Sequence, residues 1–239
     1  QHNVNRGEYN VKIFEIGRTF FLDNHKILPL EEVMVSGALT GMWEGKQWYK
    51  KEEELNFFDA KGLIVALMEN LGIKEWSLRE AINPIFHPGR CAEVLVNNET
   101  IGIFGELNPD VQMSYDLPNR VIVFELKEKG LISSATLIRN FAPFSRYPEI
   151  SLDLAVVVDE KISSEEVKKV ILKWGTALLK EIRLFDLYTG KQVAAGKKSL
   201  AYTLTYCADD RTLTSEEVNQ IHEKIIGKLK EELRAEIRA

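Results

Sequence analysis

Residues that could carry out catalysis are few and are scattered along the chain. The histidines are His2, His25, His87 and His222. None lies in a recognisable nucleophile motif, in which Ser, Cys or Thr needs a base within reach and a third group to orient it. Cys91 and Cys207 have no CxxC partner, which argues against a zinc site or a disulfide framework. P-loop and dinucleotide-binding glycine patterns are absent, so no catalytic or metal site is predicted.

Two short polar segments could still bind a ligand. In His87-Pro88-Gly89-Arg90, the Arg90 guanidinium could clamp a carboxylate or phosphate, although Pro and Gly also suit an ordinary β-turn. Asp209-Asp210-Arg211 could suggest a metal site. However, Thr214 and Glu217 form a T-x-x-E capping box, and acidic residues are favourable just before a helix N-terminus. A structural interpretation is favoured for both segments.

The residue pattern that best suits a ligand is an arginine beside an aromatic residue on a predicted strand. Along Leu178–Tyr188, alternation places Ile182 and Leu184 on one face and Arg183 and Phe185 on the other. RNA-recognition domains stack bases on sheet aromatics flanked by basic residues. The same predicted face carries Asp153, Ala155, Ala201, Thr203 and Thr205, and Lys197, Lys198 and Arg146 border it. The alternative is a face packed against another domain or subunit, and the residues alone do not separate the two.

The stretch from Tyr147 to Ile237 must position these side chains. Strand-like alternation of apolar residues appears at Leu152, Leu154, Val156 and Val158, and again at Leu200, Tyr202, Leu204 and Tyr206. Helical spacing links Val167, Val170, Ile171 and Trp174, and then Val218, Ile221, Ile225, Leu229 and Leu233. With a short last strand at Glu236-Ile237-Arg238, the order is the ferredoxin-like βαββαβ arrangement, with both helices on one sheet face.

Residues 1–127 predict an α+β domain built on a mostly antiparallel sheet. Strands are expected at Val11–Leu22, Glu32–Met42, Ala92–Val96, Ile101–Leu107 and Val121–Leu126. Asp23-Asn24-His25 is expected to turn the first strand back, and residues 97–100 to close a hairpin. One helix is expected to begin at Asp59 as N-cap. Its predicted buried stripe is Leu63, Leu67 and Leu71.

Composition indicates an ordinary globular protein. The 239 residues are 45% hydrophobic and 28% charged, which allows one large or two modest domains. No apolar run approaches the roughly 20 residues needed to cross a bilayer, and a reducing cytoplasmic location is expected from the cysteines. From Phe141 onward there are 16 Lys+Arg and 16 Asp+Glu, which leaves 15 and 20 for residues 1–140. The whole net charge of -5 therefore lies in the first part, and any nucleic-acid-binding face must be local.

Several segments of the second part together resemble one known family. They are Tyr147-Pro148, Asp153–Asp159, Leu184–Tyr188, Gly196–Tyr202 and Arg211–Val218. In this order they resemble the ferredoxin-fold anticodon-binding domain that ends the β subunit of bacterial phenylalanyl-tRNA synthetase. In the first part, Phe14–Arg18, Phe57–Gly62, His87–Arg90 and Gly102–Leu107 resemble the class II synthetase-like, non-catalytic core of the same subunit. The resemblance covers essentially the whole chain.

The resemblance implies an organisation and a function. The expected domains are a class II synthetase-like core at 1–127, incomplete at its N-terminus, a linker at 128–145 and an anticodon-binding domain at 146–239. The chain would be a C-terminal piece of a longer subunit. It would bind tRNA-Phe and the catalytic α subunit, in a heterotetramer of two α and two β subunits. ATP and Mg²⁺ would act only in the complete enzyme, and no cofactor is expected in this piece.

The resemblance also gives the expected site residues. The expected tRNA-binding residues are Arg146, Arg183, Phe185, Lys197, Lys198 and Thr203. Arg18-Thr19-Phe20 lacks the Glu of a class II Arg-x-Glu pair, which supports a non-catalytic core. Ser151 and Leu152 stand where many relatives have an Arg pair, so that contact is missing or moved. A purely structural module is the alternative, and the absent motifs argue against an independent small-molecule enzyme.

Overall fold

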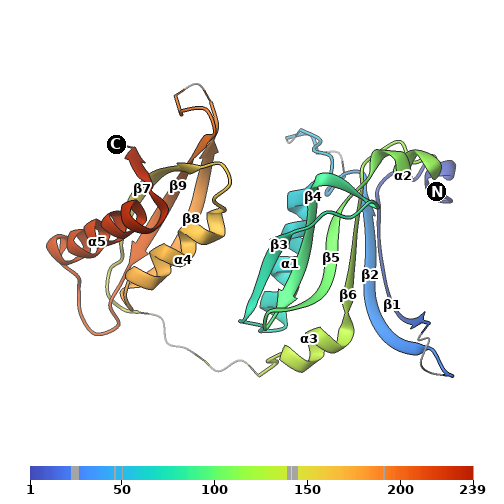
Figure 1. The fold of residues 1–239 in the computed structure, drawn as a ribbon, viewed down its shortest axis with the longest axis horizontal. Helices are drawn as coiled ribbons and strands as arrows, with labels where there is room; N and C mark the ends of the chain where they lie inside the picture. The colour runs from blue at the N-terminus through green and yellow to red at the C-terminus, as the bar shows by residue number, and fades with distance from the viewer. Residues whose placement is uncertain are drawn as a thin grey trace. The chain divides into compact units, whose positions relative to one another are not determined.

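A computed structural model describes residues 1–22, 27–45, 47–49, 51–138, 141, 145–190 and 192–238. The chain divides into two compact units, Gln1–Asn140 and Phe141–Ala239. Each unit has its own antiparallel sheet (Figure 1). Each unit also has its own hydrophobic core. The α+β class is confirmed. The predicted turn at Asp23-Asn24-His25 lies outside the described residues.

The first unit is a six-stranded sheet with the strand order β1-β2-β6-β5-β4-β3. Its strands are β1 (Val11–Phe21), β2 (Leu30–Thr40), β3 (Trp76–Glu80), β4 (Phe86–Val96), β5 (Glu99–Leu107) and β6 (Val121–Lys127). Its helices are η1 (Val4–Arg6), α1 (Phe57–Asn70), α2 (Pro109–Ser114) and α3 (Glu128–Ser134). All pairings between these strands are antiparallel. The β4–β5 hairpin turns on Asn97 and Asn98, both with positive φ, as a tight two-residue turn requires.

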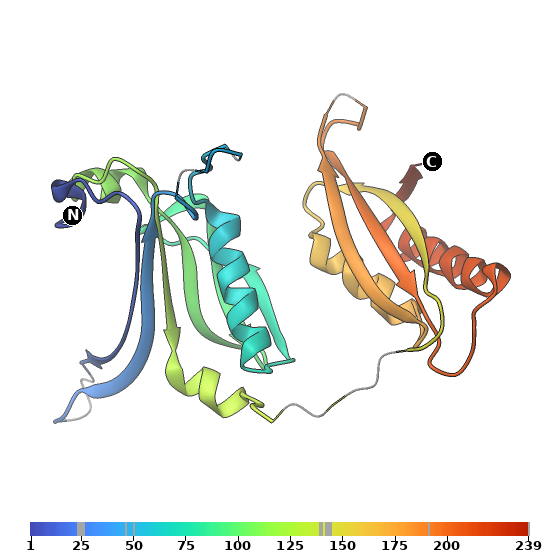
Figure 2. The same cartoon turned by 180° about the vertical axis from the view of Figure 1, so that it is seen from behind.

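Helix α1 covers one face of this sheet (Figure 2) and builds the core there. Ala60, Ile64 and Met68 are its buried residues, spaced by four, and they pack into one cluster with residues such as Phe104 and Ile122. The predicted stripe of leucines 63, 67 and 71 was wrong, because these leucines flank the core and are only half-buried.

The start of α1 also differs from the prediction. Asn56 is the N-cap, and its side chain accepts a hydrogen bond from the Phe58 backbone N–H. Asp59 lies at the third helical position and accepts from the Asn56 backbone N–H at 2.8 Å. The two side chains therefore share the capping that the sequence assigned to Asp59 alone, as in a capping box.

Two further segments of the first unit depart from expectation. Residues 87–90, predicted as a β-turn, lie inside β4, where the pairing register shifts between Phe86 and Cys91 and Gly89 has a φ of +80°. Residues 128–134, assigned to the linker, form α3. Leu131 of α3 is buried in the first core, so this helix belongs to the first unit.

The second unit has a four-stranded sheet with the order β10-β7-β9-β8. Its elements are β7 (Ile150–Asp159), α4 (Ser164–Trp174), β8 (Leu179–Tyr188), β9 (Lys197–Tyr206), α5 (Ser215–Leu233) and β10 (Glu236–Arg238). Both helices lie on one face of the sheet, which confirms the ferredoxin-like arrangement (Figure 2).

The core between helices and sheet holds the residues that alternation and helical spacing predicted. Leu154, Val156 and Val158 of β7 are buried, as are the apolar positions of β9 from Leu200 to Tyr206. Helix α5 begins at the predicted capping box of Thr214 and Glu217. No helix formed by the described residues of this unit lies on the opposite face of the sheet, so its side chains are available for a partner.

Candidate nucleic-acid interface

The open face of the second sheet is organised in rows that run across its strands. In an antiparallel sheet, residues paired in register point to the same face. Arg183 of β8 pairs with Thr203 of β9, and Thr203 pairs with Asp153 of β7. The Thr203 hydroxyl donates a 2.7 Å hydrogen bond to Asp153 Oδ1, and Arg183 has no hydrogen-bond or ion-pair partner among the described residues. This row therefore presents a free guanidinium beside a carboxylate.

The neighbouring rows bring an aromatic ring and a second arginine together. Tyr188 pairs with Ser199, and Asp186 pairs with Ala201. Arg238 of β10 pairs with Ala155 and extends over the face, so that its guanidinium carbon lies 5.7 Å from the centre of the Tyr188 ring. Arg238 also donates to Gln192 in the loop before β9. Small residues (Ala155, Ala201 and Ser199) lie between these long side chains, so they leave room on the sheet surface.

A bulge in β8 changes which side chains share the open face. The register shifts between Leu184 and Asp186, and Phe185 is the additional residue. Simple alternation predicted Arg183 and Phe185 on one face, but the bulge instead brings Asp186 and Tyr188 onto the face of Arg183. Phe185 remains 52% exposed at this edge strand. Alternation therefore failed at one residue and misassigned the side chains that follow it.

The two lysines at the start of β9 point to opposite faces. Lys197 pairs with Asp159 on the open side and forms an ion pair with Glu236. Lys198 pairs with Val158 on the helix side, and its Nζ donates to the Glu160 carbonyl oxygen at 2.8 Å. The expected Lys197-Lys198 edge is therefore divided between the two faces of the sheet.

Arg146 lies at the other end of the sheet from Lys197. The neighbouring Ser145 hydroxyl donates to the carbonyl oxygen of Ala208, just beyond the end of β9, at 2.7 Å. Lys197 begins β9, and Thr205 near the end of that strand is eight residues further on, about 27 Å in an extended strand. Arg146 is exposed, but the structure does not bring it together with Lys197.

The charges on the open face are mixed rather than basic. Arg183, Arg238 and Lys197 are accompanied by the acidic residues Asp153, Asp159, Glu181, Asp186 and Glu236. Ser151, where the resemblance led us to expect an arginine, forms a 3.2 Å hydrogen bond with Thr205 between their hydroxyls, and Leu152 packs against the helix-side core. Phosphate binding needs surplus positive charge, whereas base recognition needs aromatic planes and hydrogen-bonding groups. This face suits base recognition better.

Sequence reasoning missed Asp186, Tyr188, Ser199 and Arg238 as members of this cluster. The sequence does place Ser199 in the same alternation as Ala201 and Thr203. Nothing in the sequence locates the bulge that carries Asp186 and Tyr188 to the open side. Arg238 was expected on the last strand, but its reach across two strands to Tyr188 depends on the small residues beneath it.

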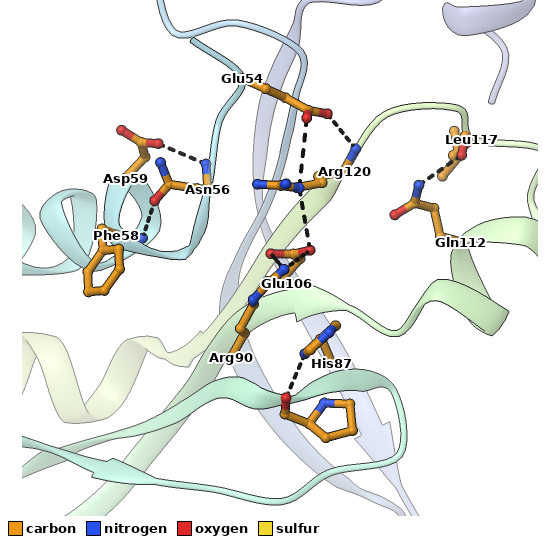
Figure 3. A network of polar contacts seen from close by, with 11 residues as sticks. Glu54, Asn56, Phe58, Asp59, His87, Arg90, Glu106, Gln112, Leu117 and Arg120 are labelled. Carbon is orange, nitrogen blue, oxygen red and sulfur yellow. Dashed lines mark hydrogen bonds and ion pairs between the residues drawn. The ribbon is translucent and has the colours of Figure 1, made fainter. Parts of the chain in front are cut away.

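The first unit contains a charge network around the buried Glu106 where the sequence suggested a ligand-binding turn (Figure 3). Arg90 Nη1 donates to both carboxylate oxygens of Glu106, at 2.8 and 2.9 Å. Arg120 lies 3.8 Å from the same carboxylate and 3.7 Å from Glu54, which also accepts from the Arg120 backbone N–H. Arg90 does clamp a carboxylate, but one of its own chain, which supports the structural interpretation.

The remaining candidates for chemistry have structural surroundings. Burial raises the pKa of the Cys91 thiol to about 11, so the reactive thiolate is scarce at neutral pH. Among the described residues, no group of three or more His, Cys, Asp or Glu side chains is arranged to hold a metal ion. Within the same residues, no helix has the length and apolar character needed to span a bilayer.

Comparison with known proteins connects both units to one subunit. Residues 1–127 match the family described as phenylalanyl tRNA synthetase beta chain CLM domain, and residues 145–238 match the ferredoxin-fold anticodon binding domain. Phenylalanine–tRNA ligase beta subunits from Lactiplantibacillus plantarum and Halalkalibacterium halodurans are 36% and 37% identical over 99% and 96% of the chain. The subunit from Symbiobacterium thermophilum is 37% identical over the whole chain.

The chain spans only 27–30% of the length of these relatives. Among solved structures, a pyrrolysyl tRNA synthetase from Desulfitobacterium hafniense is 14% identical, with a TM-score of 0.41 over 55% of this chain and 44% of that one. That likeness is too weak to show a shared fold.

Proposed function

The chain belongs to the phenylalanyl-tRNA synthetase β-chain family, and on that premise we propose that it supports phenylalanine–tRNA ligase by binding tRNA-Phe. The observation that carries this proposal is the group of Asp186, Tyr188, Ser199 and Arg238 on the open face of the second sheet. Unstacked RNA bases, such as those of an anticodon loop, bind where a protein places an aromatic ring beside hydrogen-bonding groups.

Each member of the group has a role in this proposal. The Tyr188 ring stacks on a base. The guanidinium of Arg238, which is planar and positively charged, lies beside that ring and offers a second flat surface for stacking. The Asp186 carboxylate accepts hydrogen bonds from base N–H groups. Ser199 is small and buried, and it leaves room beside the Tyr188 ring. Arg183, Thr203 and Lys197 extend the contact along the open face. Phe185 at the edge of this face and Arg146 at its far end contact the adjoining RNA, whereas Lys198 faces the helix side and lies outside this contact.

We also propose that the first unit is a class II synthetase-like core without catalytic activity. Arg18 lies on β1 and forms an exposed ion pair with Glu31 at 3.3 Å, rather than standing free for a phosphate. The Arg18-Thr19-Phe20 sequence lacks the expected acidic partner. These residues do not fit ATP with Mg²⁺, and both would bind on the catalytic α subunit of the complete cytoplasmic enzyme.

The proposed α-subunit contact in the first unit involves β1. This edge strand exposes Phe14, Ile16 and Phe20 on the helix-side face, beyond the strands that α1 covers. Exposed apolar groups of this size indicate a protein partner. The proposed assembly contains two α and two β subunits.

The test is a titration of the chain with tRNA-Phe at two salt concentrations. Loss of one stacked base contributes about 1–3 kcal/mol, so Tyr188→Ala should weaken binding about 10-fold. Arg183→Glu with Lys197→Glu should weaken binding and flatten its salt dependence. Lys230→Glu on the exposed side of α5 is the matched control and should bind like the original chain.

Unchanged affinity in Tyr188→Ala would remove the base-stacking site. Unchanged affinity in the Arg183/Lys197 variant would remove the charged part of the surface. In an ATP–pyrophosphate exchange assay, the chain alone should be inactive. A positive result would overturn the non-catalytic assignment.

A structural role remains a second candidate because β8 exposes apolar residues. Leu184, Phe185 and Leu187 are 40–55% exposed along this edge strand, which also suits packing against protein. In that case the chain would bind the α subunit but not tRNA-Phe at either salt concentration.

A further inference from the structure

The face of the first sheet opposite α1 contains a hollow of about 470 Å³. Its floor comes from adjacent strands, where Ile13, Ala38 and Val123 pair in one row and Ile103 lies in the next. The segment from Asn83 to Phe86 forms one wall. This volume is in the range that holds a small organic molecule.

Phe86 can take its place in the wall because it lies over Gly105. A side chain at Gly105 would bring its Cβ within 2.8 Å of the Phe86 ring and within 2.5 Å of the Arg90 carbonyl oxygen. The glycine therefore allows a buried aromatic ring to lie close to the sheet and close the apolar end of the hollow. That end suits a hydrocarbon or aromatic group.

The other end of the hollow is acidic. Glu15 of β1 pairs with Ser36 of β2, and Ser36 pairs with Glu125 of β6, so the three residues form one row on this face. Two strand spacings, about 10 Å, separate the two glutamates, and the Ser36 hydroxyl lies between them. Side chains of this length can converge on one cation above Ser36.

Within the part of the chain that the structure describes, no hydrogen bond or ion pair compensates the charge of these two glutamates. Neither carboxylate forms a hydrogen bond or an ion pair with a described residue. The nearest basic groups on this face are engaged elsewhere: Lys127 lies 3.2 Å from Glu32, and Arg79 lies 2.6 Å from Glu93. An apolar floor joined to two uncompensated carboxylates therefore favours a ligand that is apolar at one end and cationic at the other.

We propose that this hollow binds a small organic ammonium compound. The ammonium group lies above Ser36 and is held by Glu15 and Glu125, and the apolar body lies on Ile13, Ala38, Ile103 and Val123. A bare divalent metal does not suit the site, because such ions need about six oxygen ligands and the floor is hydrocarbon. The proposal concerns a site separate from the RNA-binding face.

The probe is 2-phenylethylamine, titrated into the full chain and followed by isothermal calorimetry and by methyl NMR. Saturable binding is expected, with shifts at the methyl groups of Ile13, Ile85, Ile103 and Val123 and none at Ile162 of the second unit. Raising the salt concentration from 50 to 300 mM should weaken binding, because the carboxylates are exposed. The neutral analogue 2-phenylethanol should bind at least 10-fold more weakly.

Glu15→Gln combined with Glu125→Gln should lower the affinity for the amine at least 10-fold. Glu93→Gln is the matched control, because Glu93 lies in the same row but already pairs with Arg79.

Equal binding of amine and alcohol, or an unchanged affinity of the double variant for the amine, would exclude ammonium recognition. Absence of saturable shifts at the lining methyl groups would exclude the site. Coverage of the same methyls by the α subunit, with no amine binding, would assign the face to a protein partner. None of these outcomes alters tRNA binding by the second unit.

Discussion

At the residue scale, Glu106 is the buried charge on which one end of the first sheet depends. Its side chain is 7% exposed, and Arg90 supplies two hydrogen bonds to it. A buried carboxylate loses its hydration and must be compensated by direct partners. Arg120 is a more distant partner that also ties the segment at Glu54 to this end of the sheet.

Replacing Arg90 with Ala should destabilise the first unit by about 2–3 kcal/mol, because Glu106 would keep its burial and lose its main partner. Arg90→Lys should cost less, since a cation remains near the carboxylate. Chemical denaturation of the two variants measures the difference. Equal stability of Arg90→Ala and the original chain would mean that Arg120 and water fully compensate Glu106.

At the element scale, α5 is joined to β9 by a titratable contact. The Tyr206 hydroxyl and His222 Nδ1 lie 3.2 Å apart, and burial raises the pKa of Tyr206 to about 12. Burial also lowers the pKa of His222 below its ordinary value, so the folded protein holds this imidazole neutral. The neutral ring can accept a hydrogen bond from the Tyr206 hydroxyl, and the protonated ring cannot.

The second unit should therefore lose stability as the pH falls from 7.5 to 5.5. In this range the unfolded chain protonates His222 near its ordinary pKa of about 6.5, while the folded chain resists protonation. Hydrogen bonds lower the pKa values of Glu166, Glu217 and Glu232, so their titration lies below this range. Thermal melts across the range measure the slope. His222→Asn keeps an acceptor for Tyr206 and should flatten the slope, and an unchanged slope would assign the effect to another group.

The helices and strands could be predicted from the sequence wherever one physical requirement alone determines the residue pattern. Residues 152–158 and 200–206 alternate because one face of each strand is buried. The capping box at Thr214 is present because the free N–H groups at a helix N-terminus need hydrogen-bond acceptors. Errors arose where several constraints compete. The buried stripe of α1 was assigned to its leucines, although Ala60, Ile64 and Met68 meet the sheet, because helix rotation depends on packing that a single helix does not encode.

The candidate site was less predictable than the fold for a similar reason. The single additional residue in the bulge, Phe185, moves the residues after it to the opposite face of the sheet. Lys197 and Lys198 lie on different faces because consecutive side chains of a strand point in opposite directions. Residues 87–90 look like a turn because Pro and Gly favour one. In the structure, the flanking residues Phe86 and Cys91 pair with β5, and residues 87–90 lie between them within β4, at a register shift.

At the scale of the whole molecule, the two units are separate in core, sheet and charge. The clusters around Ile64 and around Val156 share no residue. All of the net charge of -5 belongs to residues 1–140. This division agrees with the proposal that the first unit contacts protein and the second contacts RNA, since excess negative charge repels a phosphate backbone.

Two unfolding transitions are expected in calorimetry, one for each unit. Ile64→Ala should destabilise the first unit by about 2–5 kcal/mol and move only one transition. Ile225→Ala is the reciprocal variant in the second core and should move only the other. If either substitution shifts both transitions together, the units fold as one cooperative body.

The exposed edge strand β1 has a consequence for the protein before it meets a partner. Unpaired backbone groups along an apolar edge offer a template on which another chain can add a strand and begin to aggregate. Lys12, Glu15 and Arg18 interrupt the apolar residues of β1 at every third position. A strand that adds to this edge would have to pack its side chains beside these charged groups, which disfavours the addition. The same edge can thus stay open to a specific subunit and still resist random self-association.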